Sequence, residues 1–393
     1  MDDSLNPKHP DAELPNRRLS WLIFGSAKLE DHLSGRANHL NLIRMVAAMA
    51  VLVSHAFPIA LGEGAAEPLE ALTGMALGGH AVAVFFILSG LLIARSFDRG
   101  SSHIRFLVAR FLRLFPALIV VLVLTVLVGA TLSELSPGVY FSTMDTLTYI
   151  PRNLSLAFLQ YSLPGVFVAN PGGSVINGSL WTLFYEVVCY IAVFGLGLLG
   201  LLRRRAVFTV MFCAIAIGYM ASLNWAPEGG IAFRIDRLAQ LGFPFALGTL
   251  AYVWRDKVVL DWRNAVVPWL LVFLSAGTMM MPFMIILAVG YSLLILGLAV
   301  KGPLLAYNRL GDYSYGVYIY AYPAQQAAVH LFPSMSPIEN MLVTAPIVLV
   351  LAALSWHLIE ERALNGVTYV TQLIENVAQR FGVGRMTRQT ESD

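Results

Sequence analysis

Two ionisable residues, His55 and Glu186, lie inside long apolar stretches of this 393-residue sequence. An ionisable side chain in such a stretch is costly to bury and usually faces a cavity or the interior of a helix bundle. A rise of about 1.5 Å per helical residue places both side chains at a similar depth. A histidine beside a carboxylate can transfer protons, with His55 as the catalytic group and Glu186 stabilising its charged form. The alternative is a hydrogen bond that only joins two helices.

A second group of candidate residues is basic. Arg110 and Arg113 stand three positions apart at the start of an apolar stretch, so their side chains share one helical face. Guanidinium groups bind phosphate oxygens through paired hydrogen bonds, which favours an anion-binding site at this pair. The alternative is that these arginines only mark the side of a membrane on which their loop lies.

Three further residues could contact a substrate. Trp181 and Tyr185 suit either stacking on a sugar ring or an aromatic belt at a membrane surface, and His330 could line a cavity. Asp312, by contrast, stands where an acid would lie near a helix N-terminus. The sequence lacks the G-x-S-x-G, P-loop, C-x-x-C and H-E-x-x-H motifs, which argues against a hydrolase, an ATPase or a metalloenzyme. We expect no metal site.

The elements that carry these residues are apolar segments long enough to span a membrane. Apolar residues make up 57% of the sequence and charged residues only 13%, and the mean hydropathy is +0.69. A helix needs about 20 apolar residues to cross the hydrocarbon core, so we predict an all-α integral membrane protein with a bundle of about ten transmembrane helices. The predicted spans cover residues 43–60, 79–97, 114–132, 179–201, 206–223, 238–254, 264–281, 283–300, 313–332 and 340–359.

The positive charges predict the orientation of this bundle. With the N-terminus in the cytoplasm, 23 of the 26 Lys and Arg residues fall on the inner side and 3 on the outer side. Positive residues concentrate in cytoplasmic loops, so we predict that both termini are cytoplasmic, an N-in, C-in topology. The three outward residues are Arg152, Arg234 and Arg237. The net charge of +2 argues against a nucleic-acid-binding protein.

The chain divides into three predicted parts. These are a cytoplasmic N-terminal segment (1–40), a transmembrane domain (41–362) and a cytoplasmic amphipathic C-terminal tail (363–393). Residues 19–29 mix apolar and polar side chains, and residues 367–381 place apolar side chains at helical spacing, which predicts a short interfacial helix at each end. No internal repeat is visible, which counts against the inverted halves of a transporter.

Six blocks of residues, in this order along the chain, resemble the acyltransferase-3 family of multi-pass membrane acyltransferases. Each block is a short motif, and their order over roughly residues 41–362 makes the resemblance specific. One departure is Ala321, which stands where many members have a histidine. The blocks are Asn41-Leu-Ile-Arg44 through Val53-Ser54-His55, Val84-Phe85-Phe86-Ile87-Leu88-Ser89-Gly90, Arg110-Phe-Leu-Arg113 with Pro116, Asn177-Gly-Ser-Leu-Trp181 through Glu186, Leu310-Gly311-Asp312-Tyr313-Ser314-Tyr315 with Tyr318, and Ser355-Trp356-His357-Leu-Ile-Glu360.

This resemblance implies an O-acyltransferase that moves an acyl group, most simply acetyl, from cytosolic acyl-CoA to a sugar hydroxyl of an exported or cell-surface glycan. His55 would be the catalytic residue, either as the base that deprotonates the hydroxyl or as the carrier of the acyl group. The other expected roles are assistance to His55 for Glu186, donor binding for Arg44, Arg110 and Arg113, and acceptor binding for Trp181, Tyr185 and His330.

The expected location is a bacterial inner (plasma) membrane. The expected partners are membrane lipid and a carbohydrate acceptor, free or lipid-linked, while a homo-oligomer is left open. The alternative function is a secondary transporter of an anionic glycan or metabolite, which would use the same buried His, Glu and Arg side chains for binding and proton coupling.

Overall fold

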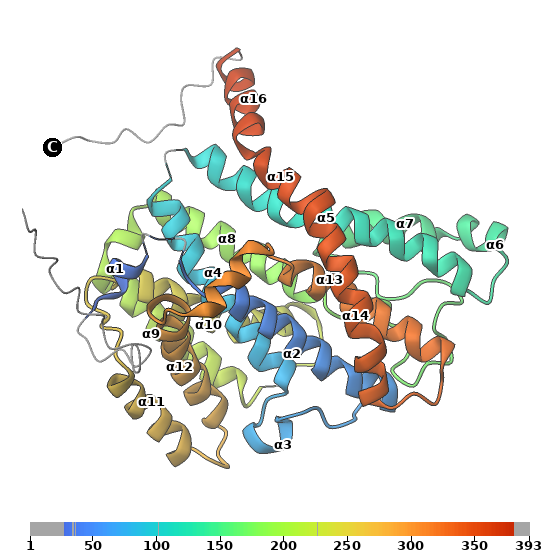
Figure 1. The fold of residues 1–393 in the computed structure, drawn as a ribbon, viewed down its shortest axis with the longest axis horizontal. Helices are drawn as coiled ribbons and strands as arrows, with labels where there is room; N and C mark the ends of the chain where they lie inside the picture. The colour runs from blue at the N-terminus through green and yellow to red at the C-terminus, as the bar shows by residue number, and fades with distance from the viewer. Residues whose placement is uncertain (1–26, 34, 36, 101, 226, 381–393) are drawn as a thin grey trace, which may run out of the picture.

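The computed structural model describes residues 27–33, 35, 37–100, 102–225 and 227–380. These residues form helices joined by loops, and Lys28 and Val259 form an isolated β-bridge (Figure 1). The α-helices are α1 (Leu29–His32), α2 (Leu40–Leu61), α3 (Glu70–Thr73), α4 (Leu77–Asp98), α5 (His103–Leu132), α6 (Pro137–Ser142), α7 (Met144–Leu154), α8 (Trp181–Leu198), α9 (Arg205–Ser222), α10 (Gly230–Val253), α11 (Trp262–Leu274), α12 (Met281–Leu294), α13 (Ser314–Leu331), α14 (Pro337–Ser355), α15 (Glu361–Asn365) and α16 (Val367–Arg380). Four short 3-10 or π-helical segments accompany them, η1 (Leu201–Arg203), η2 (Ile295–Ala299), η3 (Pro303–Arg309) and η4 (Trp356–Glu360).

Seven helical stretches in the described ranges are long and apolar enough to cross a membrane. They are Leu40–Leu61, Leu77–Asp98, His103–Leu132, Trp181–Leu198, Arg205–Ser222, Met281–Ala299 and Pro337–Arg380. The prediction of an all-α membrane protein is therefore confirmed. The count of about ten spans stays a prediction, because α11 has only 13 residues and α10 and α13 carry several polar side chains. The N-in, C-in orientation also stays a prediction.

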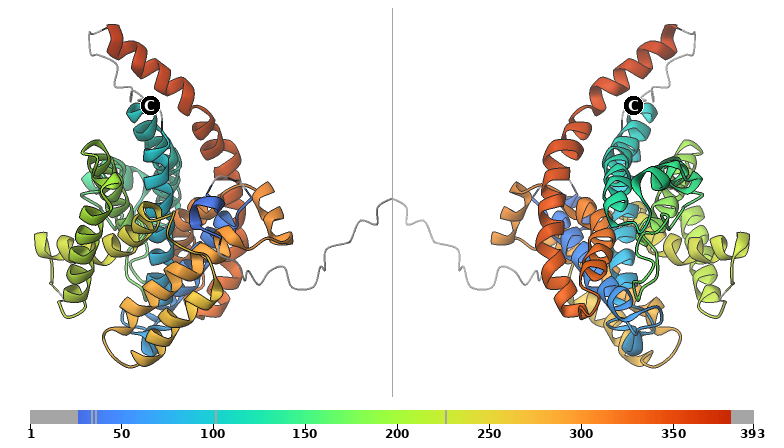
Figure 2. Two further views of the ribbon diagram at one scale, coloured as in Figure 1. Left: turned by 90° about the vertical axis from the view of Figure 1, so that its left-hand side faces the viewer. Right: turned by 90° about the vertical axis from the view of Figure 1, so that its right-hand side faces the viewer.

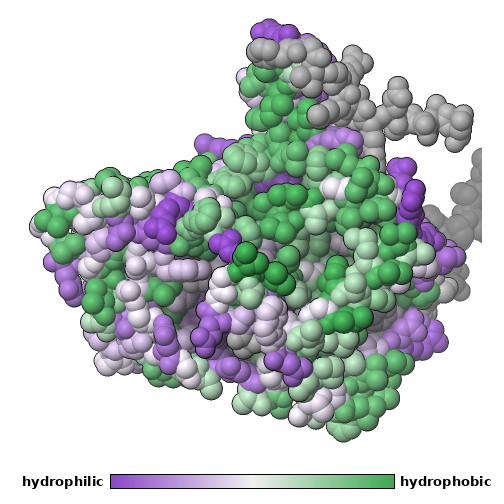
Figure 3. All heavy atoms as spheres, turned by 180° about the vertical axis from the view of Figure 1, so that it is seen from behind, coloured by the Kyte–Doolittle hydropathy of each residue, from purple (hydrophilic) through white to green (hydrophobic). Residues whose placement is uncertain are grey.

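Many large apolar side chains point away from the bundle. Val210 of α9 is 70% exposed, Phe273 of α11 75% and Leu342 of α14 70%. Figure 3 shows such hydrophobic side chains in broad patches on one face of the molecule. A water-soluble protein rarely exposes large contiguous apolar patches, so these surfaces suit contact with lipid hydrocarbon.

The helix that carries Arg110 and Arg113 begins earlier than predicted. We expected a span from residue 114, but α5 starts at His103 and runs for 30 residues. Ser102 caps it, because its hydroxyl accepts a hydrogen bond from the Arg105 backbone N–H at 3.3 Å. Both arginines therefore lie inside a continuous helix, whose backbone fixes the positions from which their side chains extend.

The predicted amphipathic segment near the C-terminus forms α16, which projects from the body of the bundle beside the start of α5 (Figures 1 and 2). Two hydrogen bonds join the helices, from Ser102 to Glu375 at 2.7 Å and from Arg105 to Thr368 at 2.9 Å. Its interfacial position remains a prediction. Of the two segments predicted to be interfacial, residues 19–26 and Phe381 lie outside the described residues.

Helices α4 and α10 approach so closely that two glycines are required at their contact. A Cβ atom on Gly90 would lie 1.9 Å from the Phe245 carbonyl oxygen, and one on Gly248 would lie 1.9 Å from the Ile87 carbonyl oxygen. The Thr249 hydroxyl also donates to the Gly90 carbonyl oxygen across this contact, at 3.2 Å. Small residues at such crossings let two backbones meet, as in many membrane helix pairs.

We expect Gly90→Ala to destabilise the protein by about 3 kcal/mol, because the added methyl group forces the α4 and α10 backbones apart. Thermal unfolding of purified protein in detergent measures this. The matched control is Gly195→Ala in α8, where a Cβ would meet no atom within 4 Å. That variant should unfold at the wild-type temperature or slightly above it. Equal unfolding temperatures for the two variants would contradict the close contact.

Candidate active site

The first of three polar cavities lies at the end of the bundle where α2 begins. It has a volume of about 360 Å³ and holds all three predicted donor-binding arginines, Arg44 from α2 and Arg110 and Arg113 from α5. Glu186 and Tyr190 of α8 line the same space. We call this the arginine cavity. The donor-binding role of these arginines stays a prediction.

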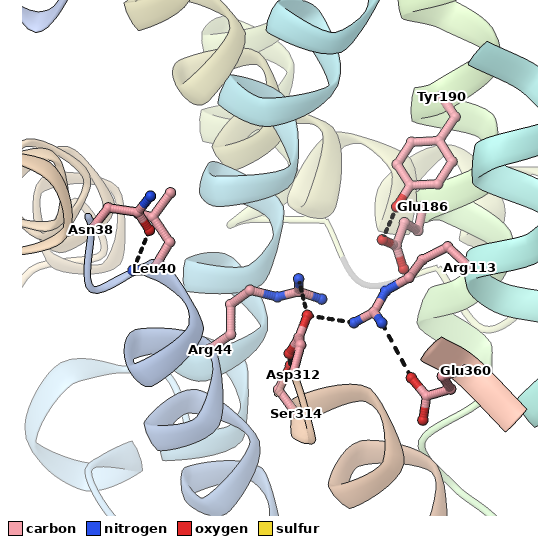
Figure 4. A network of polar contacts seen from close by, with 9 residues as sticks. All are labelled: Asn38, Leu40, Arg44, Arg113, Glu186, Tyr190, Asp312, Ser314 and Glu360. Atoms are coloured by element: carbon pink, nitrogen blue, oxygen red, sulfur yellow. Dashed lines mark hydrogen bonds and ion pairs between the residues drawn. The ribbon is translucent and has the colours of Figure 1, made fainter. Parts of the chain in front are cut away.

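An ion-pair network forms one wall of the arginine cavity (Figure 4). The Asp312 Oδ2 atom accepts hydrogen bonds from Arg44 at 2.7 Å and from Arg113 at 2.6 Å. Arg113 also donates to Glu360 of η4 at 3.2 Å. Asp312 and Glu360 are 8% and 1% exposed, so this network ties α2, α5, the start of α13 and η4 together in a buried site.

Asp312 therefore does more than the sequence suggested. The Ser314 hydroxyl donates to its second carboxylate oxygen at 2.5 Å, which places the acid next to the start of α13 as expected. Its main contacts, however, are two guanidinium groups. Glu360 is likewise held by the Ser355 hydroxyl at 2.9 Å. Removing either acid would leave the buried Arg113 with one carboxylate instead of two, and removing Asp312 would also leave Arg44 without a carboxylate partner among the described residues, which is destabilising.

Arg110 differs from Arg113 in having no carboxylate within ion-pair distance among the described residues. Its guanidinium lies over the ring of Tyr190 at 5.9 Å and over that of Phe106 at 6.0 Å, and its buried Nε atom has no hydrogen-bond partner within that part of the chain. Glu186, which lines the same cavity, accepts a hydrogen bond from the Tyr190 hydroxyl. Arg110 is therefore the guanidinium best able to accept a bound anion.

The second cavity contains His55. It has a volume of about 430 Å³ and is also lined by Glu67, from the loop between α2 and α4. The His55 ring meets the Tyr322 ring edge-on, with 5.2 Å between the ring centres. Its Nδ1 atom is buried and has no hydrogen-bond partner in the described ranges. We call this the histidine cavity. The His55 Nδ1 atom is thus without a competing protein partner among the described residues.

Glu67 is a carboxylate that the sequence analysis did not select. It accepts a hydrogen bond from the Ser54 hydroxyl, one residue before His55, and Ser54 in turn accepts from the Gly78 backbone N–H at 2.8 Å. Burial raises the pKa of Glu67 above its ordinary value. The only sequence signal was its place in a short loop that returns the chain beside His55.

A thin wall separates the arginine cavity from the histidine cavity. Val82, Thr182 and Tyr318 line both of them. The Thr182 and Tyr318 hydroxyl groups are hydrogen-bonded at 2.6 Å, and the Tyr318 hydroxyl also lies 3.0 Å from the Ser179 carbonyl oxygen. A single layer of side chains thus stands between the Arg110 side and the His55 side.

The structure does not pair His55 with Glu186 as expected. No hydrogen bond joins them among the described residues, and Glu186 lines the arginine cavity while His55 lines the histidine cavity. The reason is position along the helix. Glu186 lies one turn, about 6 Å, beyond Thr182 of the separating wall, so its carboxylate lies on the arginine side.

The predicted acceptor-binding residues separate into two places. Trp181 lines the histidine cavity and also a third cavity of about 600 Å³, which Tyr185 shares. His330, near the end of α13, lines none of these three cavities and packs against the Phe167 ring, with 5.6 Å between the ring centres. Across the residues the structure describes, no three His, Cys, Asp or Glu side chains are grouped as metal ligands.

Apolar spanning helices around buried polar cavities define a multi-pass membrane protein that can act on polar molecules. The chain belongs to the acyltransferase-3 family, whose model, described as an acyltransferase domain, matches residues 38–359. It is therefore a membrane acyltransferase.

Two curated relatives support this assignment. An O-acetyl transferase of Shigella phage Sf6 is 32% identical over 336 residues, which cover 84% of this chain and 97% of the relative. Nodulation protein 10 of Rhizobium leguminosarum bv. viciae is 28% identical over 365 residues, which cover 85% of this chain and 95% of the relative. No solved structure matches the chain.

Proposed function

We propose that this protein transfers an acyl group, most simply acetyl, from acyl-CoA to a sugar hydroxyl of an exported or cell-surface glycan. The observation that carries the proposal is the arrangement of the two cavities. Among the described residues, one holds an arginine without an acidic partner, the other holds an unpaired histidine nitrogen, and Val82, Thr182 and Tyr318 line both. The name of the phage relative, O-acetyl transferase, supports acetyl as the group transferred.

The proposed orientation places the arginine cavity at the cytoplasmic side of a bacterial inner membrane. The excess of Lys and Arg at that end of the helices supports this. The donor phosphates would bind Arg110, and the pantetheine arm would carry the thioester past the Thr182–Tyr318 hydrogen bond toward His55. The acceptor would enter the histidine cavity from the opposite end of the bundle.

In the proposed reaction, His55 removes the proton from the sugar hydroxyl as that oxygen attacks the thioester carbonyl carbon. The carbon–sulfur bond breaks, the new carbon–oxygen bond makes the ester, and the imidazolium returns its proton to the CoA thiolate. Atoms and charge balance without a metal or a redox partner. The buried, unpaired Nδ1 atom supports this role, because no group in the described residues competes for that nitrogen.

A secondary transporter would use the same buried groups, but membership in an acyltransferase family favours the enzyme. The proposal is tested by comparing the glycans of cells with and without the gene, by mass and linkage analysis. We expect a mass increase of one acyl group on a sugar hydroxyl when the gene is present. Identical glycans in the two strains, together with uptake or export of an unmodified solute, would establish the transporter instead.

Substitutions at two glutamates test which cavity binds the donor and which one carries out the reaction. Glu67→Gln removes the carboxylate from the histidine cavity. We expect a lower kcat with an unchanged donor Kd, because the nearby negative charge that stabilises the His55 imidazolium is lost. Glu186→Gln removes a negative charge from the arginine cavity, so we expect an equal or tighter donor Kd. Radiolabelled acetyl-CoA binding and initial rates measure both. Weaker donor binding for Glu67→Gln would contradict the assignment of the two cavities.

A further inference from the structure

The third cavity collects all three arginines of the predicted outward segments. Arg152 of α7 and Arg234 and Arg237 of α10 line the same space of about 600 Å³. The segments expected on that side contain no other Lys or Arg. Three positive charges drawn from two distant parts of the chain therefore meet in one place, where the positive-inside rule disfavours them.

Aromatic rings hold these guanidinium groups in place. Arg234 lies over the Phe184 ring at 5.4 Å and donates to the Ala157 carbonyl oxygen at 2.7 Å. Arg237 lies over the Phe233 ring at 5.0 Å and over the Trp181 ring at 5.9 Å. Stacking of this kind leaves the edge of a guanidinium free for hydrogen bonds.

The positive charge of this cavity is only partly balanced. Arg237 has Asp236 at 3.7 Å and donates to Gln240 at 2.8 Å. Arg152 and Arg234 have no carboxylate within 4 Å in the described part of the chain, and they donate hydrogen bonds to the backbone oxygens of Phe158 and Ala157, respectively. The cavity thus offers two guanidinium groups without a protein counter-charge, beside aromatic rings.

The third cavity adjoins the histidine cavity, because Trp181 and Arg237 line both. A group bound by Arg152 and Arg234 would therefore place whatever is attached to it near His55. Aromatic rings stack on sugar rings, and guanidinium groups bind carboxylates and phosphates in a bidentate manner.

We infer that the third cavity binds the acceptor through an anionic group attached to the carbohydrate, and that Arg152 and Arg234 are its ligands. This inference rests on the proposed function, of which it names the acceptor class. The anion is either a uronate carboxylate of the glycan or the diphosphate of a lipid carrier. Both have the same chemistry toward a guanidinium, and the probes below distinguish them.

The test is binding of three probes to the full chain in detergent, measured by calorimetry without any acyl donor. The probes are a hyaluronan tetrasaccharide, which carries uronates, geranylgeranyl diphosphate, and chitotetraose as the neutral sugar. We expect one of the two anionic probes to bind more tightly than chitotetraose. Arg152→Ala and Arg234→Ala should each weaken that binding by about tenfold or more.

The matched control is Arg204→Ala, an exposed arginine at the opposite end of the bundle. It should bind the anionic probe like wild type. Preferential binding of the hyaluronan probe identifies an acidic glycan, and preferential binding of the diphosphate identifies a lipid-linked acceptor. Equal binding of all three probes, or binding unaffected by both arginine variants, would overturn the inference.

The assay also separates this inference from the proposed reaction. Binding of an anionic probe that depends on Arg234, in a protein that transfers no acyl group, would contradict the proposed function alone. Acyl transfer with an acceptor KM unchanged in Arg152→Ala and Arg234→Ala would contradict this inference alone.

Discussion

Replacing His55 with alanine should reduce acyl transfer by about a hundredfold or more, because the sugar hydroxyl then lacks the base that removes its proton. The protein should still fold and bind acyl-CoA, since the proposed site of the donor phosphates is the arginine cavity, on the other side of the Thr182–Tyr318 wall. Initial rates with labelled acetyl-CoA measure the loss, and thermal unfolding checks the fold.

The matched control for this experiment is His330→Ala. His330 also lies in a helix of the bundle, but it packs against Phe167 and lines none of the three cavities. We expect that variant to keep most of its activity. A His55→Ala protein with near-normal turnover, or an inactive His330→Ala protein of normal stability, would contradict the assignment of the catalytic base.

Replacement by alanine should have different effects at Arg110 and at Arg113. Arg110 has no carboxylate partner among the described residues, so its loss should weaken acyl-CoA binding by about 1.5–3 kcal/mol, or roughly ten- to a hundredfold. Lysine should restore only part of this, because an ammonium group cannot form the bidentate contact. Direct titration with acetyl-CoA gives the Kd.

Loss of Arg113 should instead destabilise the fold. Its removal leaves Glu360 buried without its cation and takes one of two arginines from Asp312, at a cost of about 3–5 kcal/mol. Arg99→Ala, at an exposed position on the same side of the bundle, should change neither property. Normal acyl-CoA binding by the Arg110→Ala protein would contradict a donor-binding role, and Arg110 would then only mark the side of the membrane on which its loop lies.

The helices were largely predictable because long apolar stretches have few alternatives in a membrane. The start of α5 was not predictable, because its first turns carry the polar residues His103, Arg105 and Arg110 and so lack an apolar pattern. Their helical structure depends on the Ser102 cap and on α16 packed alongside. Likewise, α10 begins eight residues before the predicted span and so includes Arg234 and Arg237.

The sequence pointed to many of the side chains that line the cavities, but not to which cavity each of them lines. Counting residues along two helices gave similar depths for His55 and Glu186, but Glu186 lies one turn beyond the wall residue Thr182 and so lines the arginine cavity. The partners of Asp312 lie 268 and 199 residues away in the sequence, so no local pattern could reveal that ion network. Glu67 was missed because it lies in a loop outside every apolar stretch.

The most direct test of the proposed function follows a labelled acetyl group from donor to acceptor. Purified protein in lipid vesicles is incubated with acetyl-CoA labelled in the acetyl group and with a glycan fraction from cells that lack the gene. We predict that the label appears as an ester on the glycan, that one free CoA thiol forms for each ester, and that both products vanish with His55→Ala. Movement of an unmodified solute across the vesicle membrane, with no CoA thiol released, would contradict the account.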